Sequence, residues 1–408
     1  MTGPPPRGPR VVLYGHDTVG LGHLRRNLTI AHRLARDMPE AHFLTLTGSN
    51  QAHAFPLPPR MDFVKIPAAA KNRDGVYMAR SLDLPLDELR DMRSRLIAEA
   101  LRSYRPDLVL VDHAPAGMDG ELMGPLEELR AVRPRAALVL GLRDVIDEPG
   151  RIRRRWKREG LLEWIERIYD RVLIYGPRGV GPSPQAYGFS RRLLGRVRFT
   201  DYIVRPGGEM SRAEARRRLG VGAEPLILLT VGGGDDGEPM LQAFLDAHER
   251  DPAPPGQLLI LTGPLMNADR AASLRARARA RPRVTVIDFD PEFPALLAAA
   301  DVVVSMAGYN TMSEILRSGV PAVVVPRVHP RLEQWMRASA LQALGLCRVV
   351  PPDEATGERL RAEVEAAIAK GLRRTPLPFG MDGVRCVSEE LRALIEQRLG
   401  SPHGAGVA

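Results

Sequence analysis

The chain has 408 residues, 44% of them hydrophobic and 26% charged, with a formal net charge of +9. This predicts two or three globular domains. It excludes a membrane-spanning protein, because no apolar run approaches the roughly 20 residues that a spanning helix needs. The first residues, MTGPPPRGPR, are not followed by a signal-peptide core, and two cysteines are too few for a disulfide framework. We expect a cytoplasmic protein with a disordered leader over residues 1–9.

Short β-branched runs alternate with helical patterns along the whole chain. The runs are continuously apolar, which is typical of parallel strands buried on both faces, and the helices between them predict an α/β fold of βαβ units. The expected strands are residues 10–15, 42–48, 62–67, 107–112, 136–142, 171–176, 226–233, 257–263, 284–289, 301–305 and 322–326.

The α/β pattern occurs twice, and each half opens with a strand that enters a glycine-rich turn. We expect two doubly wound, Rossmann-like domains that face each other across a cleft, because ligands bind at the carboxyl ends of such strands. The linker is expected near Val204 to Gly208, and a last helix over 383–399 is expected to return to the first domain. The predicted divisions are residues 10–205, residues 206–380 and a disordered tail over 400–408.

Arginine-rich helical patterns carry most of the excess positive charge, as in RIRRRWKREG (151–160) and LRARARARPR (274–283). Such runs are usually solvated helix faces. The alternatives are attraction to anionic substrates or to an anionic membrane surface, which would place the protein at the inner face of the cell membrane. No zinc-finger spacing, RNA-binding aromatic motif or basic zipper is present, so nucleic acid is not an expected partner.

The first glycine-rich turn, GHDTVGLGH (15–23), matches neither common nucleotide motif. Leu21 stands where a P-loop needs lysine, and GLGHLR lacks the third glycine of a dinucleotide fingerprint. His23 therefore remains as the one side chain that this turn brings to the start of a helix. A lone histidine is more often structural, and the alternative is a general base.

The second glycine-rich turn contains Gly232, Gly233 and Gly234 between a strand and a predicted helix. A plain strand–helix turn is one interpretation. Consecutive glycines also allow the backbone to approach a phosphate closely.

A third turn lies in ADVVVSMAGYNTMSEILRSGVPAVVVP (300–326), where Thr311 and Glu314 have capping-box spacing. The alternative is that this turn and helix N-terminus hold an anionic ligand, with Glu314 contacting its hydroxyl groups.

Residues 300–326, followed by HPRLEQWMRASALQALG (329–345), resemble the C-terminal domain of family-28-type glycosyltransferases, which include the N-acetylglucosaminyltransferase of lipid II synthesis. DGVYMARSLDL (74–84), RPDLVLVDHAPAGMDGEL (105–122), GLRDV (141–145) and PRLEQ (330–334) resemble a related, less characterised bacterial group. The resemblance covers about residues 10–395. It implies a GT-B fold and a metal-independent, inverting transfer of a hexose or N-acetylhexosamine from a nucleotide sugar, with UDP as the expected nucleotide, to a hydroxyl acceptor. That acceptor would be lipid-linked or a secondary metabolite.

The resemblance also assigns roles to residues. His23 in GLGH matches a histidine near the reacting centre and is the expected base, and Gly22 before it is expected to contact the nucleotide sugar. Glu314 matches the acid that binds the donor ribose. The other expected donor residues are Gly308, Asn310 and Thr311 beside the diphosphate, Phe289 and Asp290 in the loop that reads the base, and Gln334 at the sugar, with Glu333 in place of a second glutamine.

Asp112, His113, Arg143 and Asp144 follow two strands and are assigned to the acceptor side, with a plain turn as the alternative. Because helix N-termini and backbone N–H groups can stabilise a leaving diphosphate, no metal and no cofactor is expected. Two other functions remain open: a nucleotide-sugar 2-epimerase or hydrolase of the same fold, and a non-catalytic protein that binds nucleotide sugars.

Overall fold

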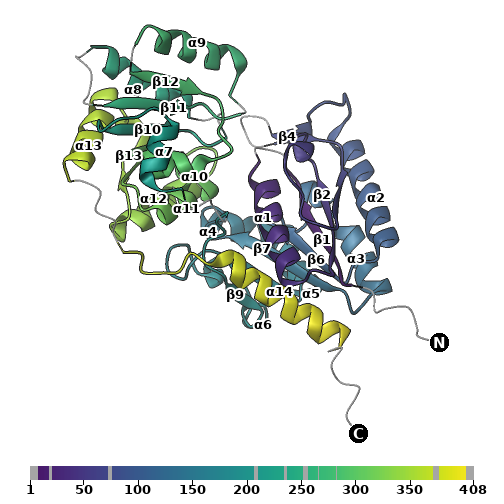
Figure 1. The fold of residues 1–408 in the computed structure, drawn as a ribbon. Coiled ribbons are helices and arrows are strands. Elements are labelled where there is room, and N and C mark those ends of the chain that lie inside the picture. The colour runs from purple at the N-terminus through teal and green to yellow at the C-terminus, as the bar shows by residue number, and fades with distance from the viewer. Residues whose placement is uncertain are drawn as a thin grey trace. The chain divides into compact units, whose positions relative to one another are not determined.

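The computed structural model describes residues 8–17, 21–71, 76–205, 210–233, 237–250, 256–264, 266–281, 283–370 and 376–400. The chain divides into two compact units (Figure 1). Unit 1 contains Met1–Ile203 together with Met381–Ala408, and unit 2 contains Val204–Gly380. Each unit is described by itself below. Residues 1–7, 401–408, Gly234 and much of the expected linker lie outside the described residues.

Unit 1 is built on a parallel seven-stranded sheet with the order β3-β2-β1-β6-β7-β8-β9. Its central strands are almost fully buried, as their continuous apolar runs predict. The order of the strands reverses between β1 and β6, where Val12 pairs with Val109. The strands are β1 (Arg10–Gly15), β2 (His42–Thr47), β3 (Met61–Lys65), β6 (Leu108–Asp112), β7 (Ala137–Arg143), β8 (Arg171–Tyr175) and β9 (Val197–Phe199).

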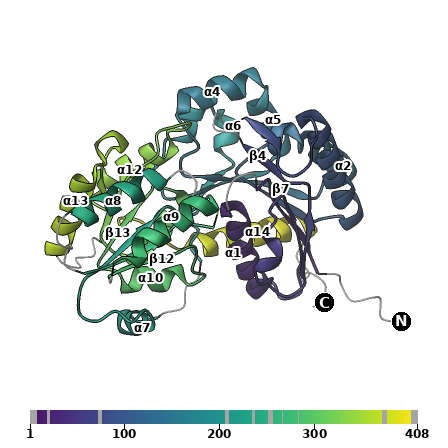
Figure 2. The same cartoon turned by 90° about the horizontal axis from the view of Figure 1, so that it is seen from above.

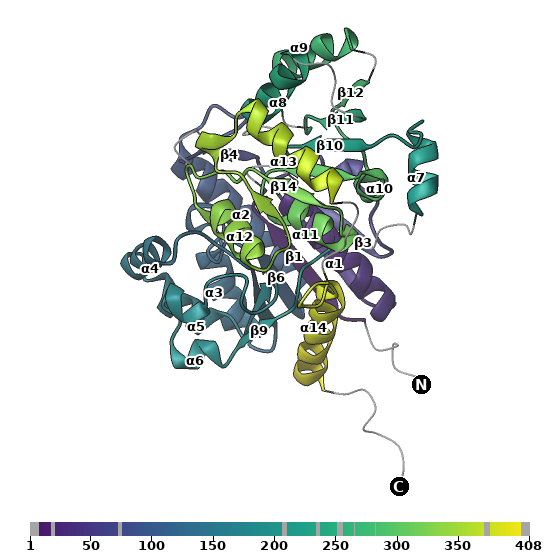
Figure 3. The ribbon, with the colours of Figure 1, turned by 90° about the vertical axis from the view of Figure 1, so that its left-hand side faces the viewer.

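Helices cover both faces of this sheet. One face packs against α2, α3 and α5 in a continuous apolar core, and α1 and α14 lie beside each other on the sheet, as Figure 3 also shows. Ser388 of α14 donates to Asp37 of α1 over 2.5 Å, so the last helix of the chain is part of unit 1. The helices are α1 (Gly22–Asp37), α2 (Leu86–Tyr104), α3 (Met123–Val132), α4 (Pro149–Arg158), α5 (Leu161–Ile168), α6 (Arg191–Leu194) and α14 (Gly383–Leu399), with 3₁₀ turns at Ala52–Ala54, Met118–Gly120 and Pro184–Tyr187.

A small antiparallel pair, β4 (Ala69–Lys71) and β5 (Tyr77–Ala79), is an addition to unit 1 that the strand pattern did not predict. It is too short to show a clear alternation of apolar and polar residues. The other unpredicted strands, β9 and β15 (Arg348–Val349), are also short and lie at sheet edges.

Unit 2 has a parallel six-stranded sheet with the order β12-β11-β10-β13-β14-β15. Its order reverses between β10 and β13, where Leu228 pairs with Val303. Both units are therefore doubly wound α/β units, as predicted. The remaining strands are β10 (Leu226–Thr230), β11 (Gln257–Leu261), β12 (Val284–Ile287), β13 (Val302–Ser305) and β14 (Ala322–Val324).

One face of the sheet of unit 2 forms an apolar core with α8, α9 and α13, and α8 and α13 lie side by side in Figure 2. Helix α10 packs against both α7 and α11. The helices are α7 (Arg212–Arg218), α8 (Glu238–Arg250), α9 (Ala268–Arg279), α10 (Phe293–Ala299), α11 (Tyr309–Ser318), α12 (Glu333–Ala343) and α13 (Gly357–Ala369), with a 3₁₀ turn at Pro352–Glu354.

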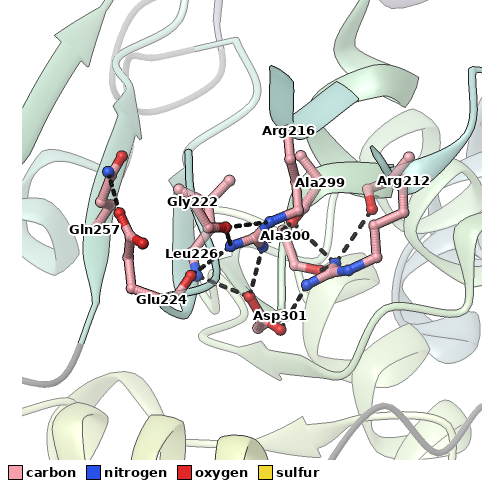
Figure 4. A network of polar contacts seen from close by, with 10 residues as sticks. Arg212, Arg216, Gly222, Glu224, Leu226, Gln257, Ala299, Ala300 and Asp301 are labelled. Atoms are coloured by element: carbon pink, nitrogen blue, oxygen red, sulfur yellow. Dashed lines mark hydrogen bonds and ion pairs between the residues drawn. The ribbon is translucent and has the colours of Figure 1, made fainter. Parts of the chain in front are cut away.

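Arginines of α7 attach this helix to the amino-terminal edge of the sheet (Figure 4). Arg212 and Arg216 both pair with Asp301, at 2.7 and 3.0 Å, and donate to backbone carbonyls at the end of α10. Asp301 also accepts from the backbone N–H of Leu226 over 2.8 Å. These contacts fix the first helix of unit 2 to its sheet.

Candidate active site

The switch point of unit 1 brings His23 and Asp112 together. Strands β1 and β6 are parallel neighbours, so the loop after β1 and the end of β6 lie at the same edge of the sheet. Nδ1 of His23, the second residue of α1, lies 2.6 Å from Oδ2 of Asp112, the last residue of β6. A Cβ at Gly15 would lie 3.1 Å from the Cβ of His23, so the absence of a side chain at Gly15 leaves room for this start of α1.

Arg26 completes this cluster, and the sequence analysis missed it. Its Nε donates to Oδ1 of Asp112 over 2.9 Å, and its Nη2 donates to Oδ2 over 2.6 Å. Burial opposes the ionisation of Asp112, but the charge of Arg26 and the hydrogen bonds from His23 and Arg26 outweigh burial and hold the pKa of Asp112 well below its usual range. The spacing His-x-x-Arg on a helix, which places both side chains on one face, was the available signal.

The ionised state of Asp112 determines which nitrogen of His23 carries the proton. An ionised carboxylate can only accept hydrogen bonds, so Nδ1 of His23 must be the donor. The other ring nitrogen, Nε2, then carries the lone pair when His23 is neutral. A histidine in this tautomer can accept a proton from a substrate.

Further polar side chains surround His23. The ring of His16 lies 4.4 Å from that of His23 and the ring of His113 lies 5.9 Å from it, both measured between centroids. Asp17 accepts from the backbone N–H of Leu24 over 3.1 Å and from Thr47 over 2.5 Å, which fixes the start of α1. Burial raises the pKa of Asp17, and His23 and Thr47 offset part of that effect. His113 has a left-handed backbone with φ 68°, a strained conformation that is frequent at functional sites.

Arg143 is the last residue of β7, the next strand after β6 in the sheet, and Asp144 follows it. The buried carboxylate of Asp144 accepts from Tyr202 over 3.0 Å and from the backbone N–H of Val145 over 2.8 Å. These contacts order the loop after β7 and connect it to Tyr202, and the assignment of Asp144 to the acceptor side stays a prediction. Arg143 is half-buried at the strand end.

The switch point of unit 2 brings three turns together. Gly232 follows β10 with φ +67°, and a Cβ there would lie 3.3 Å from Oγ1 of Thr311, in α11 after β13. Gly263 follows β11 with φ +81°, and a Cβ there would lie 2.6 Å from the carbonyl oxygen of Gly232 and 2.7 Å from Gly233. Only glycine at position 263 permits this packing.

The predicted capping box at Thr311 and Glu314 is wrong. Helix α11 begins earlier, with Gly308 as its N-cap, and no side chain caps it. Thr311 is therefore the third residue of the helix and Glu314 the sixth, which is too far along for reciprocal capping. Among the described helix starts of this unit, a capping box is present at Ser211 and Glu214. The N-terminus of α11, with Asn310 in its first turn, has the backbone N–H groups that can bind an anion.

Glu314 has a charged partner that the sequence analysis also missed. Nε of Arg205 donates to its Oε1 over 3.0 Å, and the side chain of Glu314 is 10% exposed. Nη1 of Arg205 donates to the carbonyl oxygen of Pro291 over 3.2 Å. The same arginine thus connects Glu314 to the loop after β12.

That loop contains Phe289 and Asp290. Phe289 is 41% exposed. The carboxylate of Asp290 pairs with Arg218 over 3.1 Å and accepts from the backbone N–H of Glu292 over 2.7 Å. The side chain of Asp290 therefore shapes the loop, and Phe289 is an apolar side chain that the loop exposes.

Gln334 and Glu333, at the start of α12, support the turn before α11. Oε1 of Gln334 accepts from the backbone N–H groups of Ala307 over 3.2 Å and of Arg327 over 3.1 Å. Glu333 is buried and pairs with the side chain of Arg327. Because the carbonyl of Gln334 has these partners, only its Nε2 is left to donate to a ligand.

The comparison with protein families identifies unit 2. The model of the glycosyltransferase family 28 C-terminal domain matches residues 227–378. The match begins in β10 and ends after α13, so it covers most of unit 2. The described donor-side candidates from Gly232 to Gln334 lie within the matched residues, and Gly22, in unit 1, lies outside them.

Relatives of the whole chain agree with the family 28 domain. A UDP-N-acetylglucosamine--N-acetylmuramyl-(pentapeptide) pyrophosphoryl-undecaprenol N-acetylglucosamine transferase of Desulforudis audaxviator is 27% identical over 402 residues, covering 94% of this chain and 98% of that protein. The crystal structure of Acinetobacter baumannii MurG has a TM-score of 0.56 at 16% identity and covers 94% of this chain and 99% of that one. CalG4, the calicheamicin glycosyltransferase, has a TM-score of 0.59 at 18% identity and covers 97% and 100%. The predictions of a GT-B fold and of a glycosyltransferase are confirmed.

Proposed function

We propose that the chain transfers a sugar from a UDP-linked donor, bound by unit 2, to a hydroxyl acceptor, bound by unit 1. The observation that carries this proposal is the hydrogen bond of 2.6 Å between His23 and the buried Asp112. In a chain with a family 28 donor domain, a neutral histidine with a free Nε2 lone pair is the group expected to activate an acceptor.

The donor is held in this proposal by backbone groups and by Glu314. The N-terminus of α11 and the turn at Gly232 and Gly233 bind the diphosphate, since helix N-termini and glycine turns present N–H groups to anions. Glu314 accepts hydrogen bonds from the ribose hydroxyls, Phe289 lies beside the base, and Nε2 of Gln334 donates to the sugar.

The transfer step needs one proton acceptor. Nε2 of His23 takes the proton of the acceptor hydroxyl as the hydroxyl oxygen forms its bond to the anomeric carbon of the sugar. The bond between that carbon and the diphosphate oxygen breaks, and UDP leaves with the electron pair. Asp112 stabilises the imidazolium that forms, and the configuration at the anomeric carbon is inverted. His113 and Arg143 contact the acceptor.

A lipid-linked acceptor is the proposed substrate class. The Desulforudis audaxviator relative has an undecaprenol-linked acceptor in its name. No helix in the described part of the chain is long and apolar enough to cross a membrane. Contact with the inner face of the cell membrane is proposed through α4, which buries Ile152 and Trp156 and exposes its arginines and Lys157.

The experiment for this proposal is a thermal-shift and product screen with UDP-, GDP-, TDP- and ADP-sugars. We expect UDP-sugars to raise the melting temperature most, and EDTA to leave turnover unchanged, because N–H groups stabilise the diphosphate. Glu314→Ala should weaken UDP binding roughly 10- to 100-fold, since a hydrogen bond to a charged group contributes about 1.5–3 kcal/mol. No capping box is lost in this variant, so a similar affinity in both proteins would remove Glu314 from the donor site.

The screen also separates the alternative functions. Free sugar or a 2-epimer formed from the donor without any acceptor would indicate a hydrolase or an epimerase. Binding of the donor without any product in the presence of acceptors would indicate a non-catalytic protein.

A further inference from the structure

Arg26 is almost completely buried, at 3% exposure, and its guanidinium is directed at a carboxylate that is 0% exposed. Nε and Nη2 donate to separate oxygens of Asp112, which is the bidentate geometry of the strongest arginine–carboxylate pairs. His23 shares the same carboxylate through Oδ2. The cluster is therefore an arginine–aspartate–histidine row, in which one carboxylate has two cationic or potentially cationic partners.

The position of Arg26 has an electrostatic consequence for His23. An ionised carboxylate beside a histidine stabilises the protonated ring. When no positive charge compensates that carboxylate, it raises the pH at which the ring loses its proton by about 1–3 pH units. A fixed positive charge on the same carboxylate opposes this effect. A general base must be neutral before it can act, so the counter-charge matters for a base and is irrelevant to a histidine that only packs.

The other groups around His23 make this compensation necessary. Asp17 is a second carboxylate that interacts with His23, from the loop after β1. His16 from the same loop and His113 from the end of β6 also face its ring. Without Arg26, two carboxylates would face His23 and no arginine would lie on its partner Asp112. With Arg26, Asp112 keeps its hydrogen bond to Nδ1 of His23 while a positive charge lies against both of its oxygens.

We propose that Arg26 is a positioning residue that fixes the carboxylate of Asp112 against Nδ1 of His23 and limits the pull of that carboxylate on the His23 proton. The ring of His23 thereby keeps its orientation, with Nδ1 toward Asp112. This inference rests on the proposed function, in which His23 is the base.

The test is a ¹⁵N NMR titration of the histidine rings in the full-length protein, with the His23 signal assigned by its absence in His23→Gln. It needs no substrate, so it can fail while the transfer reaction stands. Arg26→Gln should raise the pH at which His23 loses its proton by about one unit or more. Arg26→Lys, which keeps the charge but not the bidentate contact, should shift it by less.

A double variant guards against misfolding. Arg26→Gln with Asp112→Asn leaves neither charge buried alone and should return the His23 titration to within about half a unit of the wild type. The inference is overturned if Arg26→Gln titrates like the wild type. The inference is also overturned if His23 of the double variant loses its proton about one pH unit or more below the wild-type value. That result would show that Arg26 does not compensate the carboxylate of Asp112 in the wild type.

Discussion

Asp112 is the residue on whose carboxylate both the proposed chemistry and the stability of unit 1 depend. It accepts hydrogen bonds from His23 and Arg26 at the end of a central strand and has no exposed surface. Removing one member of a buried charged group leaves the other without a partner, which typically costs a few kcal/mol. Replacing the carboxylate of Asp112 also removes the acceptor that fixes the tautomer of His23.

Asp112→Asn should therefore lower kcat by roughly 10²–10⁴-fold and lower the free energy of unfolding by about 3 kcal/mol at neutral pH. The pKa of Asp112 is lower in the folded than in the unfolded chain, where it is about 3.9. The ionised carboxylate therefore stabilises the fold fully above about pH 3.9. This stabilisation is lost as the pH falls from about 3.9 through the lower pKa of the folded state. The stability difference between variant and wild type should narrow at acidic pH. Urea unfolding of both proteins between pH 3 and pH 7 measures this difference in the free energy of unfolding.

Asp107→Asn is the matched control for that variant. Asp107 precedes the same strand, and its carboxylate also pairs with an arginine, Arg133, over 2.9 Å, but at the opposite end from His23. The Asp107→Asn variant should be less stable than the wild type and should have the same kcat. A loss of kcat in both variants would assign the effect of Asp112→Asn to the fold alone.

The individual residues of the site were only partly predictable from the sequence. His23, Glu314 and the glycines stand next to recognisable turns, so their positions follow from local pattern. The partners Arg26 and Arg205 do not, because each acts through a contact with a residue that is distant in sequence, Asp112 or Glu314. In a chain rich in arginine, only its spacing from His23 sets Arg26 apart from arginines on solvated faces, and no comparable spacing marks Arg205.

At the scale of elements, the donor side depends on how three strand ends pack. Gly263→Ala should weaken UDP binding about tenfold or more, because its Cβ would press on Gly232 and Gly233 at the turn proposed to bind the diphosphate. Isothermal titration with UDP measures the change.

Gly345→Ala provides the control for that experiment. Gly345 has a similar backbone, φ +71° against φ +81°, but a Cβ there meets no atom within 4 Å. Both variants carry the strain of about 1–2 kcal/mol that a left-handed alanine imposes. Equal UDP affinity in the two variants would show that the turn at Gly232 does not depend on Gly263.

The sequence located the elements well and their ends less well. Apolar runs identified β10, but residues 231–233 continue the run beyond the strand, since Val231 is buried in the turn. The start of α11 was misplaced for a related reason. Thr311 and Glu314 have the spacing of a cap, yet Gly308 ends the extended segment first, and sequence spacing alone does not distinguish these starts.

For the molecule as a whole, the excess positive charge has two different environments. Arginines of α9 pair with acids of α8, as Arg277 does with Asp246 and Glu249. On α4, Arg153 and Arg154 are exposed, while Trp156 is buried against Phe189. Trp164 is also buried, so neither tryptophan can anchor in a lipid surface. The attraction of α4 to an anionic membrane surface should therefore be purely electrostatic.

The full-length protein should co-sediment with anionic vesicles at low salt and dissociate at high salt, because each basic residue near the surface contributes about 1 kcal/mol. Arg153→Glu with Arg154→Glu should abolish the binding, and Arg279→Glu on α9 should reduce it much less. If the wild type does not bind anionic vesicles at low salt, a soluble acceptor becomes the better proposal.

The most direct measurement of the central claim is the turnover of His23→Asn with the UDP-sugar that the screen identifies and a lipid-linked acceptor, together with its affinity for UDP. Asparagine keeps a hydrogen bond but cannot accept the proton. We predict that the wild type transfers the sugar, and that His23→Asn and His23→Ala both lose roughly 10²–10⁴-fold in kcat while their Kd for UDP stays within about twofold. A His23→Asn variant that transfers sugar at the wild-type rate would contradict the assignment of His23 as the base.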